Sequence, residues 1–203
     1  DILLRDGTRR SFSMANAPYD NEFVQLHIRH VPGGSFTDHV FLKMKEREIL
    51  RFEAPLGTFA LREDSTKPIV FVASGTGFAP IKSILETAFR AGNTRPMTLY
   101  WGGRRPKDLY MNDLPQQWAA EHANFRYVPV ISDALPEDQW TGRSGFVHRA
   151  VMADFPDLSG HEVYACGVPV MVDAARKDFV AQCGLPEADF YCDSFTTAAD
   201  KAG

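Results

Sequence analysis

The amino-acid sequence predicts two domains of different class: a small antiparallel β-barrel, followed by an open, doubly wound parallel α/β domain. Before residue 65, short segments of alternating polarity are separated by Gly, Pro and Asn, as in antiparallel sheets. After it, apolar runs of strand length alternate with helical periodicity, as in a parallel sheet covered by helices. A polar stretch with a proline, residues 64–68, separates the two patterns. We therefore predict a barrel over residues 1–64 and an α/β domain over residues 65–203.

The barrel prediction depends on short segments with period-two stretches, at residues 1–4, 10–14, 23–31 and 49–53. Residues 27–31 alternate polar and apolar side chains as a half-buried strand would. One helix is predicted over residues 35–43, where Ser35 can cap the helix and Phe36, Val40 and Phe41 share a face.

The α/β prediction depends on five apolar strands, at residues 69–73, 97–101, 125–131, 163–165 and 190–192. Helical patterns lie between them, at residues 80–91, 109–122, 148–155 and 170–182. Ligands of such a sheet bind beyond the carboxyl ends of its strands.

Composition narrows the function classes. The 203 residues carry a formal net charge of -4, which gives no reason to propose nucleic acid as a partner. No apolar run approaches the roughly 20 residues of a membrane span. The three cysteines have no metal-binding spacing, so we expect neither a metal site nor an iron–sulfur cluster within this chain. An odd, sparse cysteine count favours a reducing compartment, and we predict a cytoplasmic protein.

The most informative stretch runs from a buried strand into Gly75-Thr76-Gly77-Phe78-Ala79-Pro80 and then a helix. A strand, a glycine turn and a helix N-terminus form an anion site, because backbone N–H groups and the positive end of the helix dipole face one point. Pro80 stands where a dinucleotide fingerprint has its third glycine, and proline suits the first turn of a helix. Taken alone, the turn also fits a structural βα loop.

Two motifs of the barrel offer groups that a flavin nucleotide needs. Arg10, Phe12 and Ser13 are expected on one face of a strand, supplying a cation, a flat ring and a hydroxyl. A glycine turn then leads into the helix that begins near Ser35 and Thr37, a second candidate phosphate cradle. An ordinary edge strand and a plain capped helix are the alternative interpretations.

Five motifs follow one another in order: Arg10-x-Phe12-Ser13, Gly34-x-Phe36-Thr37, Pro55-x-Gly57-x-Phe59, Gly75-Thr76-Gly77-Phe78-Ala79-Pro80 and Tyr164-x-Cys166-Gly167-x-Pro169-x-Met171. Together they resemble the ferredoxin–NADP reductase superfamily, over nearly the whole chain. The similarity extends to the NAD(P)H-dependent reductase components of bacterial oxygenases and of CDP-6-deoxyhexose formation, and to flavin reductases. The chain enters this pattern partway into the barrel, so the resemblance implies a Greek-key flavin-binding barrel that is incomplete at its N-terminus.

The resemblance also implies site residues. Arg10 would hold the flavin phosphate, Phe12 would pack on the flavin, and Ser13 would lie near flavin N5. The flavin chain would meet the backbone of His27, Ile28 and Arg29, and its pyrophosphate would meet Gly34, Ser35 and Thr37. The nicotinamide dinucleotide would bind at Gly75, Thr76, Gly77 and Pro80, with Cys166, Gly167, Pro169 and Met171 beside the nicotinamide. Ser13, Cys166 and the terminal aromatic Phe195 would frame the transfer site, although Phe195 also fits a core position.

Charge near the adenosine ribose distinguishes NADH from NADPH. Asp133 follows a predicted strand, and a carboxylate there would repel a 2′-phosphate. Arg104 and Arg105 favour NADPH, because their positive charge would attract a 2′-phosphate. We predict NADH, with NADPH left open.

These motifs predict an NAD(P)H-dependent FAD oxidoreductase, which takes a hydride from nicotinamide and passes electrons to an acceptor protein or domain with an iron–sulfur centre. A flavin reductase that releases reduced flavin is one alternative. A nucleotide-binding regulatory module without turnover is another.

Overall fold

The structure, a computed structural model, describes residues 1–196 and contains two sheets. The larger sheet has six parallel strands in the order β7-β6-β5-β4-β8-β9. Their bounds are β4 Ile69–Ser74, β5 Met97–Gly103, β6 Phe125–Ile131, β7 Arg143–Ser144, β8 Glu162–Gly167 and β9 Phe190–Ser194. The strand order reverses between β4 and β8, and this topological switch point is where such sheets bind ligands.

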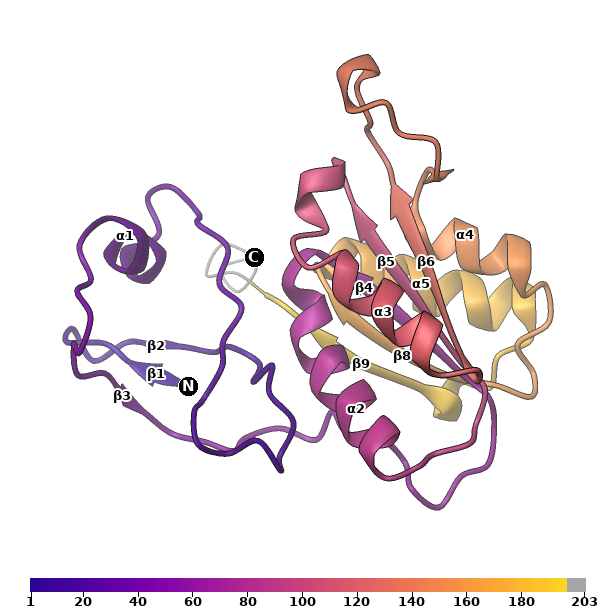
Figure 1. Cartoon of the computed structure of the whole chain (residues 1–203), viewed down its shortest axis with the longest axis horizontal. Helices are drawn as coiled ribbons and strands as arrows, with labels where there is room; N and C mark the ends of the chain where they lie inside the picture. Colours follow the sequence, from indigo (N-terminus) through magenta and orange to yellow (C-terminus); the bar gives the residue numbers. More distant parts are fainter. Residues whose placement is uncertain (197–203) are drawn as a thin grey trace.

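Four helices cover the two faces of this sheet (Figure 1). Helices α2 (Phe78–Arg90) and α3 (Asp113–Glu121) pack on one face, and α4 (Val147–Asp154) and α5 (Pro169–Cys183) pack on the other. The central strands β4, β5 and β8 are buried on both faces, which explains their nearly continuous apolar sequences. The last helix ends at Gly184, whose φ of 67° is the left-handed conformation of a helix C-terminus.

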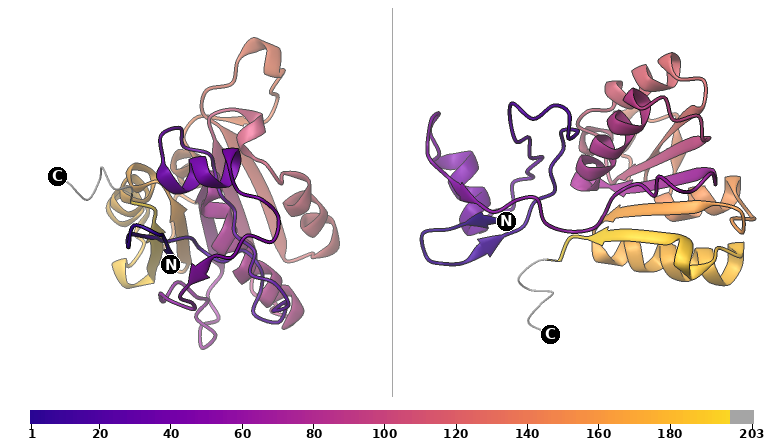
Figure 2. Two further views of the ribbon diagram at one scale, coloured as in Figure 1. Left: turned by 90° about the vertical axis from the view of Figure 1, so that its left-hand side faces the viewer. Right: turned by 90° about the horizontal axis from the view of Figure 1, so that it is seen from below.

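The smaller sheet is antiparallel, in the order β2-β1-β3. Its strands are short: β1 Ile2–Leu3, β2 Arg9–Arg10 and β3 Arg51–Phe52. Helix α1 (Ser35–Leu42) belongs to the same domain, which lies beside the α/β domain (Figure 2). An antiparallel part followed by a doubly wound α/β part confirms the predicted fold class. The exact division at residue 64 stays a prediction, and residues 197–203 lie outside the described part.

Several predicted elements of the small domain are wrong in extent. Residues 23–31 form no strand; a single bridge joins Met14 to Leu26. The Ala15 N–H donates to the Gln25 carbonyl as part of this bridge, but the pairing does not extend into a ladder, because the Gln25 N–H donates to a side-chain oxygen, Asn16 Oδ1. The predicted strands at residues 10–14 and 49–53 shrink to two residues each.

In the α/β domain, the predicted helix over residues 109–122 begins only at Asp113. A 3-10 turn over Pro106–Asp108 and hydrogen-bonded turns up to residue 112 use the first part of that segment. Strand β7 was not expected, because two residues are too short to show a period in sequence. No helix within residues 1–196 has the length and apolar character needed to cross a bilayer.

A buried ion pair anchors the segment that joins the domains. Arg95 Nη2 lies 2.6 Å from Glu162 Oε2, and both side chains are almost fully buried. Arg95 also donates to the carbonyl oxygens of Lys67 at 2.6 Å and Arg62 at 3.0 Å. The guanidinium therefore fixes residues 62–67 against the amino end of β8.

Candidate functional site

The first part of the site is the turn between β4 and α2. Gly75–Gly77 form one turn of 3-10 helix, and Gly75 has a φ of 52°. A Cβ atom on Gly77 would lie 2.1 Å from the carbonyl oxygen of Cys166, so only glycine lets the turn approach β8 this closely. Helix α2 follows, with Pro80 in its first turn and no side-chain cap among the described residues. The free N–H groups and the helix dipole fit a nucleotide phosphate.

The second part is the turn between β8 and α5. Gly167 has a φ of 145°, and a Cβ there would lie 2.1 Å from Ser74 Oγ. The Ser74 hydroxyl oxygen accepts a hydrogen bond from the Val168 N–H at 3.1 Å. Helix α5 then begins at Pro169. The carboxyl ends of β4 and β8 are thereby held together at the switch point.

Cys166 lies at this junction and is fully buried. Burial raises the pKa of its thiol well above the usual value, and Asp193 adds to the effect. The thiol is therefore protonated at neutral pH, and it can frame a site but not act as a nucleophile. Met171, in the first turn of α5, is buried in a core cluster, and its place beside the nicotinamide stays a prediction.

The small domain reaches the same junction through Ser13. The Ser13 hydroxyl donates to Asp193 Oδ2 at 3.0 Å, and Asp193 is the register partner of Cys166 in the β8–β9 ladder. Phe195 follows two residues later; its N–H donates to the Gly167 carbonyl at 2.8 Å, and its ring is partly buried. The structure thus brings together the residues predicted to frame the transfer site. It adds Asp193, for which the only sequence signal was a carboxylate on the last strand.

The prediction that Arg10, Phe12 and Ser13 share one face of a strand is wrong. Strand β2 ends at Arg10, the Phe12 ring packs against Phe36 with centroids 5.3 Å apart, and Ser13 turns to the α/β domain. The chain leaves the sheet because residues 15 and 16 bond to α2: their carbonyls accept from the Lys82 ammonium at 3.2 Å and the Ser83 hydroxyl at 3.0 Å.

The candidate phosphate cradle lies at the N-terminus of α1. Arg10 Nη2 lies 3.5 Å from Ser35 Oγ, so a cation stands beside the first residue of the helix. A Cβ on Gly34 would lie 2.7 Å from Thr37 Oγ1, which keeps this turn tight. The first N–H groups of the helix have no partner within the helix and are available to an anion.

Asp38 in the first turn of α1 opposes an anion at this cradle. Its carboxylate pairs with His30 Nε2 at 2.8 Å and accepts from the Gly33 N–H at 3.1 Å. Those contacts satisfy Asp38 locally, and the Arg10 guanidinium supplies the positive charge that a phosphate needs. A cradle formed by Arg10 and the first turn of α1 therefore fits a flavin pyrophosphate, with Arg10 as its main cation.

The three residues expected near the flavin chain lie in an extended segment between this cradle and the α/β domain. Ile28 is half-buried and Arg29 is exposed. The side chain of His27 faces the α/β domain, where its Nδ1 lies 2.7 Å from Tyr110 Oη. The role of their backbone groups in cofactor binding stays a prediction.

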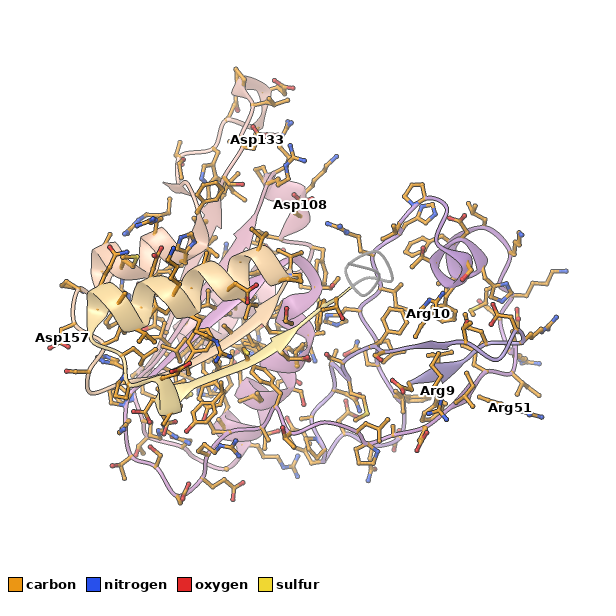
Figure 3. The ribbon with its side chains drawn as sticks, turned by 180° about the vertical axis from the view of Figure 1, so that it is seen from behind. Arg9, Arg10, Arg51, Asp108, Asp133 and Asp157 are labelled. Carbon is orange, nitrogen blue, oxygen red and sulfur yellow. The ribbon has the colours of Figure 1, made fainter. Side chains whose placement is uncertain are left out.

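The residues expected at the adenosine end lie at the carboxyl edge of the sheet, where a loop projects between β6 and β7 (Figures 1 and 3). Arg104 and Asp133 are paired, with Nη2 and Oδ2 2.8 Å apart, and both are exposed. Arg105 is engaged by Asp138, whose carboxylate accepts from its Nε at 2.7 Å and its Nη2 at 3.2 Å. The hydrogen bond lowers the pKa of Asp138 and raises the pKa of Arg105.

One aromatic residue at this edge was not singled out from the sequence. Phe146 follows β7 and is 67% exposed. The Gly145 N–H donates to the Ile131 carbonyl at 2.9 Å, so Phe146 starts from the strand end that also leads to Asp133. An exposed flat ring at this edge is a candidate for stacking on a base. The sequence shows only that Phe146 follows a glycine, and without the unexpected strand β7 this pair could not be assigned to the edge of the sheet.

Within residues 1–196, no three His, Cys, Asp or Glu side chains gather as a metal site requires. The geometry instead presents two phosphate cradles, one in each domain, and a polar junction between them. The comparisons with known proteins agree with this arrangement. An oxidoreductase FAD-binding domain matches residues 3–61, and an oxidoreductase NAD-binding domain matches residues 71–177. The chain belongs to this family of FAD- and NAD-binding oxidoreductases.

Relatives of this oxidoreductase include reductases of two kinds. The chain is 46% identical over 193 residues to the CDP-6-deoxy-L-threo-D-glycero-4-hexulose-3-dehydrase reductase of Yersinia pestis, covering 95% of the chain and 57% of the relative. It is 39% identical to terephthalate 1,2-dioxygenase reductase component 1 of Comamonas sp, covering 97% of the chain and 57% of the relative. The chain therefore spans a little over half the length of these relatives.

Solved structures agree on the fold. The cytochrome P450 reductase GcoB of Amycolatopsis has a TM-score of 0.89 at 34% identity, with 97% of the chain and 60% of that protein covered. A ferredoxin NADP+ reductase from Neisseria gonorrhoeae with bound FAD and NADP has a TM-score of 0.77 at 20% identity, covering 91% of the chain and 79% of that protein. The predicted resemblance to the ferredoxin–NADP reductase superfamily is confirmed.

Proposed function

We propose that the protein is an NADH-dependent FAD oxidoreductase that passes electrons to an acceptor protein or domain with an iron–sulfur centre. The observation that carries the proposal is the junction at the switch point, where Ser13 bonds Asp193 beside Cys166. Ser13 belongs to residues 10–29, which we call the flavin-bearing segment because they include the residues expected around the flavin from Arg10 to Arg29. An oxidoreductase of this type needs its two nucleotide sites to open onto one point, and this junction joins them. Bound FAD and a nicotinamide dinucleotide supply the hydride and single-electron chemistry.

The flavin side is held by charge and shape. Arg10 and the first turn of α1 bind the pyrophosphate, with the Ser35 hydroxyl as a further donor. Phe12, kept in place by Phe36, offers an apolar surface to the flavin. These groups bind and orient the cofactor.

At the junction, the chain's own groups direct hydrogen bonds. The Ser13 hydroxyl donates a hydrogen bond to Asp193. The lone pairs of Ser13 Oγ are therefore left to accept a hydrogen bond from a ligand in the crevice. The neutral Cys166 thiol fills the position beside it without adding charge. The Gly75 and Gly77 backbone admits the dinucleotide.

The preference for NADH is supported by the pairing of both arginines at the adenosine end. Arg104 is engaged by Asp133, and Arg105 is engaged by Asp138. A 2′-phosphate would meet a carboxylate and find neither guanidinium free, whereas two ribose hydroxyls would find an acceptor in Asp133. The preference is expected to be modest because the Arg104–Asp133 pair is exposed and such pairs contribute little.

The acceptor is proposed from the relatives, whose names make them reductases of a dehydrase and of an oxygenase. A reduced flavin can pass its electrons on one at a time, which suits an iron–sulfur centre as the acceptor. We also propose a reducing compartment, the cytoplasm. Three free cysteines among the described residues support it.

The test is a flavin and turnover measurement on the purified protein. FAD retained through gel filtration, with faster flavin reduction by NADH than by NADPH, is expected; Ser13→Ala should slow reduction by about tenfold, because an oriented hydrogen bond at the reacting centre is lost. Ser11→Ala is the matched control, since the only hydrogen bond of the Ser11 hydroxyl within residues 1–196 goes to the half-buried Asp1 carboxylate. Rapid loss of reduced flavin would favour a flavin reductase, and absence of NADH oxidation with a dye acceptor would refute an enzyme.

A further inference from the structure

The two domains meet along the segment that follows the flavin motif. Besides Ser13, residues 15 and 16 bond to Lys82 and Ser83 of α2, and His27 bonds to Tyr110. Of these contact residues, only His27 has a buried ring nitrogen, Nε2, that lacks a hydrogen-bond partner among the described residues. A role for His27 has to account for this unpartnered ring nitrogen.

The His27 ring begins a continuous aromatic path into the α/β domain. It lies edge-on to Tyr110, with centroids 5.3 Å apart, and near-parallel to Phe78 at 6.4 Å. Phe78 stacks on Trp101 at 4.1 Å, and Trp101 Nε1 donates to the Gly75 carbonyl at 2.9 Å. The path therefore links the flavin-bearing segment to the first glycine of the Gly75–Gly77 turn, which we call the dinucleotide turn.

The surroundings of the ring select one tautomer. Burial and the nearby Lys82 ammonium lower the pKa of His27 to about 4, so the ring is neutral with a single proton. A proton on Nε2 would be a buried donor without an acceptor, in the field of a cation. A proton on Nδ1 donates to Tyr110 Oη at 2.7 Å. The Nδ1–H tautomer is therefore favoured, with the Tyr110 oxygen as acceptor.

We propose that His27 and Tyr110 form a positioning pair that fixes the flavin-bearing segment relative to the dinucleotide turn. The inference rests on the proposed function, because the purpose of the fixed separation is hydride transfer between the two cofactors. Neither residue needs to touch a reacting atom. The pair acts through the Tyr110–Trp101–Gly75 contacts on one side and through the segment between His27 and Ser13 on the other.

The pair makes a specific demand on substitutions at residue 27. In His27→Asn the side-chain amide can donate from near the position of Nδ1, whereas in His27→Gln it reaches toward Nε2, where no partner lies within residues 1–196. Tyr110→Phe removes only the hydroxyl and keeps the ring. The matched control is Tyr127→Phe, because the Tyr127 hydroxyl also bonds one side chain, Asn112 at 2.8 Å, away from the domain contact.

The first experiment measures flavin reduction in a single turnover of the FAD-loaded protein. His27→Gln and Tyr110→Phe should each slow reduction by about tenfold while the Kd for NADH stays within about twofold, because small misplacements act on the transfer step. His27→Asn should stay near wild type, as should Tyr127→Phe. The double variant of His27→Gln and Tyr110→Phe should be no slower than either single one. Unchanged rates in Tyr110→Phe, or additive losses, would overturn the pair.

The second experiment does not depend on turnover. The ¹⁵N resonances of the His27 ring should report a proton on Nδ1 in the wild-type protein, and hydrogen exchange of the Ala15 amide should speed up in Tyr110→Phe but not in Tyr127→Phe. Unchanged exchange would refute the pair even in an active enzyme, and a proton on Nε2 would refute the assignment of Nδ1 as the donor, because the Tyr110 hydroxyl would then donate to Nδ1. A protein that shows the expected tautomer and exchange but oxidises no NADH would instead refute the proposed function.

Discussion

Two glycines of the same turn offer a sharp test of how the dinucleotide site is built. Gly77 is held against the backbone of β8, where an added Cβ would lie 2.1 Å from the Cys166 carbonyl oxygen and 2.8 Å from the Gly167 nitrogen. Gly75, two residues earlier, has a φ of 52°, and no atom of the described residues lies within 4 Å of an added Cβ. Alanine at Gly77 therefore clashes with the backbone of β8, whereas alanine at Gly75 has room for its Cβ but must adopt a left-handed backbone conformation.

The magnitudes follow from these contacts. Relief of the Gly77→Ala clash needs a separation of about 1 Å between the turn and β8, because real Cβ contacts are not shorter than 3.0 Å. Both sides are backbone, so we expect a loss of stability of about 3 kcal/mol, the upper end for overpacking. Gly75→Ala should lose about 1–2 kcal/mol, the usual difference for the left-handed region.

Urea unfolding and NADH titration measure the two effects. The Kd for NADH should rise by about tenfold or more in Gly77→Ala, because the turn can no longer close on β8, and by only about twofold in Gly75→Ala, whose N–H groups keep their place. Equal stabilities and equal affinities of the two variants would refute the view that close approach to Cys166 shapes this site.

Three further predictions follow from charges. Asp133→Asn should raise the NADPH-to-NADH ratio of kcat/KM by about fivefold, the scale of an exposed charge pair, while Asp157→Asn at the far end of the sheet (Figure 3) should leave the ratio unchanged in steady-state assays. Arg95→Met should lower the free energy of unfolding by about 3–5 kcal/mol in urea, because it leaves Glu162 buried without its partner; a loss below about 1 kcal/mol would contradict this. The unfolded state protonates His27 below its ordinary pKa of 6.5, whereas the folded state resists protonation until about pH 4. The contribution of His27 to the free energy of unfolding should therefore be fully present above pH 6.5 and fall by about 3 kcal/mol between pH 6.5 and 4. Unfolding curves of His27→Asn should lack this part of the loss.

Sequence reasoning located the α/β domain well, because its central strands are buried on both faces and read as unbroken apolar runs. It failed at residues 23–31, where alternation predicted a strand. Alternation reports only that a segment can be half-buried. The pairing of this segment stops at the single Met14–Leu26 bridge, where the Gln25 N–H bonds to the side chain of Asn16 in place of a neighbouring strand.

The same division holds within the candidate site. The glycine turns were predictable because a strand, glycines and a helix start are local signals. Asp193 and Phe146 could not be predicted as site residues, because each is placed there by a contact with a distant part of the chain. Asp193 contacts Ser13, and Phe146 follows a strand that pairs with the end of β6. Met171 is buried in the core cluster beside α5, and its expected place beside the nicotinamide stays a prediction.

The order of residues alone determined the fold class, the two glycine turns and the family resemblance, since periodicity and turn chemistry act over a few neighbouring residues. Only the tertiary structure decided that Ser13 meets Asp193 beside Cys166 and that His27 meets Tyr110. These contacts join residues as much as 180 positions apart. Their geometry depends on how whole elements pack, which no local pattern encodes.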